Sequence, residues 1–500
     1  MNYHGIIFTG QNHGWGEYMK TIGAYRIRTI AAQEGYNVRV VDHTQYLTVE
    51  EIVKVCETLM SEDLMFISLS KTFITDPELL FNIETAMSIL KRMYPKVKFL
   101  VGGAGTYLPK VVPNPWDFKL VGFSEYSFVD LLDYLSGKSN QLKHQIIIKG
   151  TFNVIQAKSY PVDYDMDNLG TVWLDEDGIL PTDSLPIEIS RGCIFKCDFC
   201  SYELNGKKKF DYFRVKDSLV KEFQYNYEKF GVTNYVFVDD TYNDSRQKLK
   251  LIDDVLGELK FKLTFETFIK PELLAAFPEQ AEQLVEQGLI SCTLGIESLH
   301  PETRKSIHKT KDYYKLEKHI RDLKYNSKGW NVGIHYTMIL GLPYEPVSSM
   351  MDNYKYLLEL DLVDDIMYQP LYMSDVTSDP SKIESNPENY GYTIETDSEK
   401  IRSSKLMMGM EDANFKLWSN SHTNFEETWR LSERLFFNEL ENRYLSGIGT
   451  VGQIRCLGVP DMHDEKRGLR KVSIASTVIS REQFRPQFQN RVEKYFSMIK

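Results

Sequence analysis

Three of the six cysteines in this chain lie on one short stretch, RGCIFKCDFC at residues 191–200. Cys193, Cys197 and Cys200 have the spacing C-x3-C-x2-C, which can place three thiolates around a single metal centre. Structural zinc sites and electron-transfer clusters normally take four protein ligands. Because this loop supplies one ligand fewer, it predicts a metal centre with an open coordination position.

A [4Fe–4S] cluster held by three thiolates leaves one iron open, and that iron can bind the amino and carboxylate groups of a small molecule. The loop resembles the signature of the radical SAM superfamily, in which an aromatic residue, here Phe199, precedes the last cysteine. The resemblance implies that the open iron binds S-adenosylmethionine and that an electron from the cluster cleaves it to methionine and a 5′-deoxyadenosyl radical. It also implies a reductase, such as flavodoxin or ferredoxin, as a partner.

The composition agrees with a large enzyme. The chain has 500 residues, of which 42% are hydrophobic, so the length predicts about three domains. The net charge of −11 argues against a generic nucleic-acid groove. The sequence shows no long apolar run and no signal peptide at its start, which predicts a cytoplasmic protein without a membrane partner. Cys56, Cys292 and Cys456 are expected to be buried single thiols.

Residues 1–139 alternate short β-branched runs with amphipathic helical patterns such as 17–34 and 78–94. The expected strands are 5–9, 38–42, 64–69, 97–101 and 120–123. Five strands with intervening helices predict a doubly wound parallel sheet, which binds ligands at the carboxyl ends of its strands.

The loops at those strand ends resemble the cobalamin-binding domain that precedes many radical SAM domains, with its motifs D-x-H-x-x-G, S-x-L and G-G. His13 has the required spacing, but Gln11 replaces the aspartate that would orient a cobalt-ligating imidazole. Ser68 approximates the serine motif, and Gly102 and Gly103 match the glycine pair. The resemblance implies that the tail of cobalamin lies against these small residues. Two alternatives remain: His13 serves packing or a polar substrate contact, or the sheet binds no ligand.

Residues 140–184 lack a sustained period and are expected to be a connector with a small hairpin. The alternation of strands and helices resumes over 185–375, which predicts a partial (βα)6 barrel with its chemistry at the carboxyl ends of the strands. The expected barrel strands are 187–190, 235–238, 263–268, 291–295, 332–340 and 366–371, and the expected helices are 216–230, 247–259, 271–286, 301–325 and 346–360.

Two barrel strands lead to carboxylates that could contact the cofactor. Asp239 and Asp240 follow the second strand, where many radical SAM proteins carry a glycine-glycine-glutamate turn that contacts the methionyl amino group. The aspartates could accept that hydrogen bond instead, although an exposed turn also favours such residues. Glu266 lies in the third strand and is expected to point into the barrel, where a buried carboxylate needs a polar ligand or an arginine.

Two later turns also resemble cofactor motifs of the superfamily. Glu297 and Ser298 follow the fourth strand, at the place of a motif that contacts the ribose and carboxylate of S-adenosylmethionine, and Arg304 is a candidate clamp for that carboxylate. Their ordinary interpretation is a polar cluster at a helix N-terminus. Gly341 follows the fifth strand and resembles the turn whose backbone binds adenine.

The alternation of strands and helices ends near residue 375, and residues 376–500 are expected to form a mainly helical C-terminal domain with helices at 399–410 and 425–444. Trp418, Phe425 and Trp429 are expected in its core. It carries no second cysteine cluster. Such a domain would cover the barrel mouth and shape the substrate pocket.

The sequence therefore predicts a radical SAM enzyme of the cobalamin-binding type, and the resemblance implies methyl transfer to an unactivated carbon or phosphorus. One alternative is a radical SAM enzyme without cobalamin that performs a rearrangement, a ring contraction or a methylthiolation. Another is a non-catalytic protein that binds a metal and a partner. The sequence does not distinguish a small-molecule substrate from a peptide.

Overall fold

The structure is a computed structural model. It describes residues 2–12, 19–74, 76–103, 115–143, 145–149, 152–156, 170–202, 206, 212–327, 332–360, 362–374, 380–410, 415–442 and 489–499. The chain divides into two compact units. The first comprises Met1–Ile187, Lys221–Val232 and Arg485–Lys500, and the second comprises Glu188–Val220 and Thr233–Phe484. The predicted domain boundaries at 139, 184 and 375 stay predictions.

The first unit contains a seven-stranded sheet in the order β2-β1-β3-β4-β5-β7-β6. Its strands are β1 (Gly5–Phe8), β2 (Val38–Val41), β3 (Phe66–Ser70), β4 (Lys98–Gly102), β5 (Phe118–Val121), β6 (Gln145–Lys149) and β7 (Phe152–Gln156). All neighbours are parallel except β6 and β7, the hairpin expected in the connector. The order β2-β1-β3-β4-β5 is that of a doubly wound fold, which confirms the predicted class.

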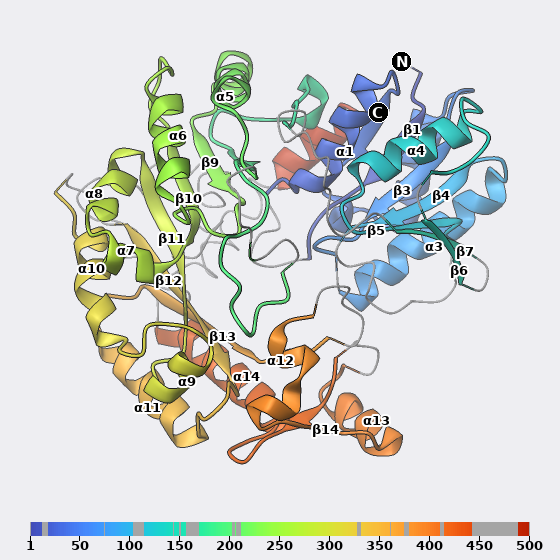
Figure 1. Cartoon of the computed structure of the whole chain (residues 1–500). Helices are drawn as coiled ribbons and strands as arrows, with labels where there is room; N and C mark the ends of the chain where they lie inside the picture. Colours follow the sequence, from blue (N-terminus) through green and yellow to red (C-terminus); the bar gives the residue numbers. More distant parts are fainter. Residues whose placement is uncertain are drawn as a thin grey trace. The chain divides into compact units, whose positions relative to one another are not determined.

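Helices cover both faces of this sheet. Its helices are α1 (Ile22–Gln33), α2 (Val49–Leu59), α3 (Pro77–Met93) and α4 (Glu125–Leu135). Figure 1 shows α1 and α4 together on one face and α3 on the other, where α2 packs beside it. Two of these helices begin at capping residues. Thr48 and Glu51 form a capping box for α2, and Asp76 caps α3 just before Pro77, the first residue of that helix.

A helical segment at residues 489–497 belongs to the first unit. Its Tyr495 hydroxyl accepts a hydrogen bond from Asp42 N at 3.0 Å, and Arg491 forms a 2.6 Å ion pair with Asp183. The last described residues therefore pack with the first sheet domain rather than with the C-terminal helices that precede them.

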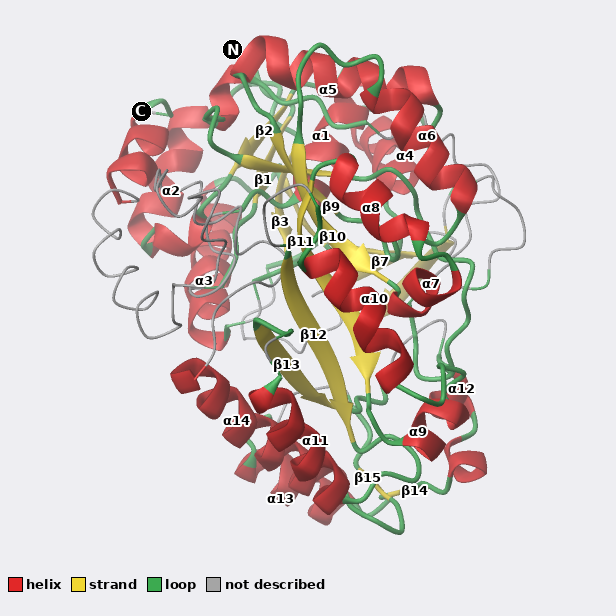
Figure 2. Ribbon diagram, turned by 90° about the vertical axis from the view of Figure 1, so that its left-hand side faces the viewer, coloured by secondary structure: helices red, strands yellow, loops and turns green. Residues whose placement is uncertain are grey.

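A six-stranded parallel sheet in the order β13-β12-β11-β10-β9-β8 follows the first sheet along the chain. Its strands are β8 (Ser184–Ile187), β9 (Asn234–Phe237), β10 (Thr264–Ile269), β11 (Leu289–Glu297), β12 (Gly333–Leu340) and β13 (Asp365–Pro370). Because each strand pairs with the next in sequence, this sheet is the predicted partial barrel. Its helices stand along the outer side of the curved strands (Figures 1 and 2).

The barrel helices are α5 (Lys216–Phe230), α6 (Arg246–Leu256), α7 (Pro271–Ala276), α8 (Glu279–Glu286), α9 (Pro301–Ser306), α10 (Tyr314–Lys324) and α11 (Val347–Glu359). The prediction of a single helix over 271–286 is wrong, because Phe277 and Pro278 interrupt the helix between α7 and α8. The helix expected over 301–325 is also two helices, which are separated by a turn in which His308 has a positive φ of 60°.

The described residues after residue 380 are mainly helical, as predicted. It contains α12 (Lys382–Ser385), α13 (Ser398–Met407) and α14 (Phe425–Asn442), with a short antiparallel pair of β14 (Thr393–Ile394) and β15 (Trp418–Ser419). Trp418 and Phe425 lie in a buried apolar cluster with Leu342 and Leu371, and Trp429 packs against it. The predicted core role of these aromatic residues is confirmed.

No helix of the described residues is long and apolar enough to cross a membrane. Cys56 and Cys292 are buried free thiols, as expected. Cys456 lies outside the described residues.

Candidate active site

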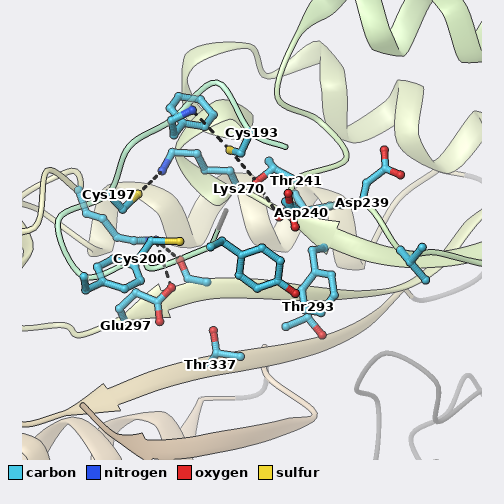
Figure 3. Close-up of a pocket in the computed structure, with 18 residues that line it drawn as sticks. Cys193, Cys197, Cys200, Asp239, Asp240, Thr241, Lys270, Thr293, Glu297 and Thr337 are labelled. Carbon is cyan, nitrogen blue, oxygen red and sulfur yellow. Dashed lines mark hydrogen bonds and ion pairs between the residues drawn. The ribbon is translucent and has the colours of Figure 1, made fainter. Parts of the chain in front are cut away.

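The three cysteines of the loop after β8 line one cavity of about 240 Å³ (Figure 3). Two backbone hydrogen bonds fold the loop around it: Cys200 N donates to Cys197 O at 3.1 Å, and Gly206 N donates to Phe195 O at 3.0 Å. Gly192, with φ at +99°, allows the turn that leads into Cys193. The loop therefore presents all three sulfurs to the same space, as the spacing predicted.

The donor set fits a cluster in which each thiolate binds a different iron. Among the described residues, no three side chains of His, Cys, Asp or Glu converge closely enough to share one ion. A cubane cluster does not require such convergence, since its ligands bind separate irons. Burial raises the pKa of the Cys193 thiol, while Phe195 N at 3.4 Å and the Thr241 hydroxyl at 3.4 Å are placed to stabilise its thiolate.

The rest of the cavity is formed where the barrel strands end. Besides Phe195, Phe199 and Tyr202 from the cluster loop, the lining comprises Val238, Asp239, Asp240, Thr241, Phe268, Ile269, Lys270, Thr293, Gly295, Glu297, Lys309 and Thr337. Except for Lys309, which follows α9, these residues lie in β9, β10, β11 and β12 or shortly after them. The cavity thus occupies the carboxyl-terminal end of the barrel, where such folds place their chemistry.

Asp239 and Asp240 are adjacent but have different environments. Asp239 is fully buried and accepts hydrogen bonds from Ile189 N at 2.9 Å and from the Ser190 hydroxyl at 2.8 Å. Its carboxylate also pairs with buried Lys248 at 2.6 Å. These contacts fix the chain just before the cluster loop, so the carboxylate oxygens of Asp239 are already bound by other residues of the protein.

Asp240 has fewer partners. One of its oxygens accepts a hydrogen bond from Gly192 N at 3.1 Å, and the residue is partly exposed to the cavity. Burial and the neighbouring Asp239 raise the pKa of Asp240 to about 6. Of the two carboxylates, Asp240 is the one that can accept a hydrogen bond from a bound molecule.

Glu297 and Lys309 form a charged pair on the other side of the cavity. Glu297 ends β11 with a positive φ of 68°, and Lys309 Nζ lies 3.6 Å from its carboxylate. Lys309 also donates to Gly295 O. Burial raises the pKa of Glu297. The backbone conformation turns this carboxylate into the cavity at the place where the sequence predicted a cofactor contact.

Glu272 links three cations next to this pair. It lies 3.0 Å from Arg304, 3.9 Å from Lys270 and 4.0 Å from Lys309. Burial alone would raise the pKa of Glu272, but these cations outweigh it and lower the pKa. With Glu297, the group holds three cations and two carboxylates, which leaves an excess of positive charge beside the cavity.

Arg304 does not line the cavity. Its guanidinium donates to Ile296 O at 2.9 Å and to Ser298 O at 2.8 Å, besides its bond to Glu272. Ser298 is buried, and its hydroxyl accepts a hydrogen bond from His300 N at 3.0 Å. Both residues brace the turn between β11 and α9, and their direct contact with a cofactor stays a prediction.

Gly341 and Glu266 also lie outside the cavity lining. A Cβ on Gly341 would lie 2.2 Å from the Trp418 ring, and its carbonyl accepts a hydrogen bond from Tyr392 at 2.7 Å. Packing therefore accounts for glycine here. Glu266 is buried within β10 and stands in register with Ser291 of β11. Phe199 does line the cavity and packs against the apolar cluster around Trp418.

Of the predicted cobalamin residues, Gly102 and Gly103 lie at the carboxyl edge of the first sheet, and His13 is outside the described residues. Ser68 is buried within β3. Gly102 ends β4, and among the described residues a Cβ there would meet only Leu120, at 3.9 Å, so the position is open with respect to them. Gly103 has φ at +92°, and a Cβ would lie 2.7 Å from the Thr72 hydroxyl.

Sequence analysis missed several residues of the cavity: Tyr202, Thr241, Lys270, Thr293, Lys309 and Thr337. Lys270 directly follows β10 and precedes Pro271, so the rule that chemistry gathers at strand ends could have found it. Lys309 could not have been found in this way, because it lies after α9 and returns to the cavity through the turn at His308.

Comparison with known proteins agrees with this geometry. Residues 187–357 match the family model of the radical SAM superfamily. An uncharacterized methyltransferase of Pyrococcus horikoshii is 25% identical over 274 residues, which are 50% of this chain and 58% of that protein. A bacteriochlorophyllide d C-8(2)-methyltransferase of Chlorobaculum tepidum is 27% identical over 203 residues, which are 39% of this chain and 42% of that protein. The chain thus spans about half the length of these curated relatives.

Two solved structures share the fold. The radical S-adenosylmethionine methyltransferase TsrM from Kitasatospora setae, solved with tryptophan and an S-adenosylmethionine analogue, has a TM-score of 0.56 at 14% identity, covering 79% of each chain. The cobalamin-dependent S-adenosylmethionine radical enzyme OxsB, solved with aqua-cobalamin and S-adenosylmethionine, has a TM-score of 0.59 at 13% identity, covering 97% of this chain and 75% of its own.

Proposed function

Since residues 187–357 match the family model of the radical SAM superfamily, we propose that the protein is a cobalamin-dependent radical SAM methyltransferase. One observation carries the proposal: the three cysteines line a cavity at the carboxyl end of a parallel barrel, in a chain that also contains a doubly wound sheet. TsrM and OxsB, whose folds resemble this chain, are a radical S-adenosylmethionine methyltransferase and a cobalamin-dependent S-adenosylmethionine radical enzyme, which supports the proposal.

When bound, a [4Fe–4S] cluster and S-adenosylmethionine supply a 5′-deoxyadenosyl radical, and cobalamin supplies a methyl carrier. Cys193, Cys197 and Cys200 would hold the cluster. Asp240 and Glu297, which reach the cavity from β9 and β11, would accept hydrogen bonds from the cofactor's ammonium and ribose groups. Asp239 would act at a distance, because it fixes the start of the cluster loop.

The carboxyl edge of the first sheet has room for a ligand at one of its predicted positions. The open space around the missing Cβ of Gly102 supports close approach by a flat or bulky group. Gly103 is different, because its positive φ and its contact with Thr72 already require glycine. We therefore assign the predicted cobalamin contact to Gly102 and leave Gly103 with a role in the turn.

The cavity offers a mixture of surfaces to a substrate. Val238 and Phe268 remain 36% and 43% exposed on the inner side of the strands, beside the charged groups. Apolar walls with a few placed polar groups are typical of sites for small organic molecules or peptide side chains. A reductase such as flavodoxin or ferredoxin would supply the electron.

The test is anaerobic reconstitution of the full chain with iron and sulfide, followed by titration with hydroxocobalamin and desalting. The proposal expects about four irons per chain, 5′-deoxyadenosine when S-adenosylmethionine and dithionite are added, and about one retained corrinoid. Iron and cleavage without retained corrinoid would leave a radical SAM enzyme that performs another reaction. Tetrahedral zinc without cleavage would overturn both.

A further inference from the structure

Lys270 places a cation next to one of the cluster cysteines. Its ammonium nitrogen lies 3.9 Å from Cys197 Sγ and 4.4 Å from the centre of the Phe195 ring (Figure 3). The side chain is only 14% exposed. A charged donor held at a ligand sulfur can influence what that sulfur binds.

The chain fixes the backbone of Lys270 on both sides. Lys270 N donates to the Asn243 side-chain oxygen at 2.9 Å, and the Asn243 amide donates to Lys270 O at 3.2 Å. Asn243 is itself buried, and its amide is also held by Gln280 at 3.1 Å. Pro271 then starts α7 and restricts the backbone of Lys270. The backbone of Lys270 is therefore held at the end of β10, and its side chain reaches the cluster loop from this fixed position.

The carboxylates near Lys270 do not neutralise the positive charge of its ammonium group. Glu272 lies 3.9 Å from Lys270 but only 3.0 Å from Arg304, and Lys309 is also within 4.0 Å. Glu272 and Glu297 together face three cations, which leaves the ammonium of Lys270 available to the sulfur and to the Phe195 ring.

We propose that Lys270 is a positioning residue for the cluster, in that its ammonium donates to the Cys197 sulfur and stabilises the reduced state. Resting on the proposed cluster, the inference follows from charge: reduction adds one electron to the cluster, and a cation at a ligand sulfur favours the more negative state. Hydrogen bonds to the sulfurs and net charge are among the factors that set cluster potentials.

The experiment compares reconstituted wild-type protein with Lys270→Gln, Lys270→Arg and Lys309→Gln, without S-adenosylmethionine. The readouts are iron per chain and the midpoint potential from a titration followed by electron paramagnetic resonance. Lys309→Gln is the matched control, because Lys309 lines the same cavity but contacts Gly295 O and Glu297. Binding of S-adenosylmethionine is measured separately.

We expect Lys270→Gln to lower the ratio of reduced to oxidised cluster about tenfold at a fixed potential, which is a midpoint about 59 mV more negative for one electron. Lys270→Arg should stay near the wild type, and Lys309→Gln should shift less. If Lys270→Gln loses its iron, recovery in Lys270→Arg supports the same contact, and loss in both variants contradicts it.

Equal shifts for Lys270→Gln and Lys309→Gln would overturn the proposal in favour of the general charge of the cavity. An unchanged potential with weakened S-adenosylmethionine binding would also overturn it and make Lys270 a contact of the cofactor carboxylate. A wild-type protein that binds no cluster would instead contradict the proposed function, so the two failures are distinguishable.

Discussion

The carboxyl edges of the two parallel sheets differ in how their polar groups are used. In the barrel, Asp240, Lys270 and Glu297 reach one cavity together with the cluster cysteines. In the first sheet, polar side chains near the strand ends bond to one another: Thr9 to Thr21 at 2.9 Å, and Asp42 to Tyr25 at 2.7 Å and to Lys20 at 3.2 Å.

From this difference we expect the two regions to recognise ligands by different means. Charged groups that converge on a cavity can orient a small polar cofactor. Since these polar side chains of the described part of the first sheet already have partners, a ligand there would be recognised through backbone and through positions without a side chain, such as Gly102. Variants in the barrel should therefore affect chemistry, and variants in the first sheet should affect binding of a bulky ligand.

The largest effect is expected from replacing Cys193, Cys197 or Cys200 by Ala. Each variant lacks one of three cluster ligands, so iron should fall from about four per chain to background and formation of 5′-deoxyadenosine should cease. Retention of hydroxocobalamin should persist, because its predicted residues lie in the other unit. Iron analysis, product analysis and corrinoid spectra check this, and normal cleavage by any of the variants would contradict the site.

The next effect concerns stability and comes from Asp239→Asn. Lys248 would lose its nearer carboxylate partner and keep Asp244 at 3.9 Å, which should cost up to about 3–5 kcal/mol of unfolding free energy. Urea unfolding measures the change. The control is Asp254→Asn, which removes an exposed pair with Lys250 and should cost less than about 1 kcal/mol. Similar losses in both variants would show that Asp239 does not anchor the start of the cluster loop.

The sequence predicted those parts of the molecule that depend on local pattern. Strand and helix periods gave both sheets to within a few residues, and the cysteine spacing located the cavity. Lysine partners were not predicted, because Lys248 reaches Asp239 from the following helix and Lys309 returns from beyond α9. Such contacts depend on tertiary packing, which no local pattern encodes.

The glycines also show that a local sequence pattern does not reveal the tertiary contacts of a residue. The sequence treated Gly102, Gly103 and Gly341 alike, as places where a ligand approaches the backbone. In the structure, Gly341 and Gly103 both have a positive φ, and a Cβ would contact Trp418 at Gly341 and Thr72 at Gly103. Among the described residues, Gly102 alone of the three has open space. A glycine in a motif has several physical causes, and the surrounding side chains decide among them.

Gly102 and Gly103 allow a sharper test of the comparison between the two sheets. Gly103→Ala should lower the unfolding free energy by about 1–2 kcal/mol, because a Cβ is strained at positive φ and would contact Thr72. Gly102→Leu should fold normally but weaken hydroxocobalamin retention about tenfold, or about 1.4 kcal/mol. Thermal unfolding and corrinoid titration measure these changes.

The control for Gly102→Leu is Gly23→Leu, on the exposed side of α1, where a Cβ also meets nothing. It should leave corrinoid retention unchanged. Equal retention in wild type and Gly102→Leu would remove Gly102 from the predicted cobalamin site and would favour a first sheet that binds its ligand elsewhere or binds none.

The smallest effect is a pH dependence at Asp240. Its folded pKa of about 6 lies above the ordinary value of 3.8, so the folded state binds this proton more tightly than the unfolded state does. The associated stability is fully present below about pH 3.8 and is lost as the pH rises through about 6. Because Asp240 is partly exposed, the loss should be about 1 kcal/mol or less.

Asp240→Asn should therefore gain stability relative to the wild type between pH 4 and pH 7, as measured by urea unfolding at each pH. A difference that does not change with pH would mean that the carboxyl of Asp240 is solvated like a surface group and is not held in the cavity for a cationic ligand.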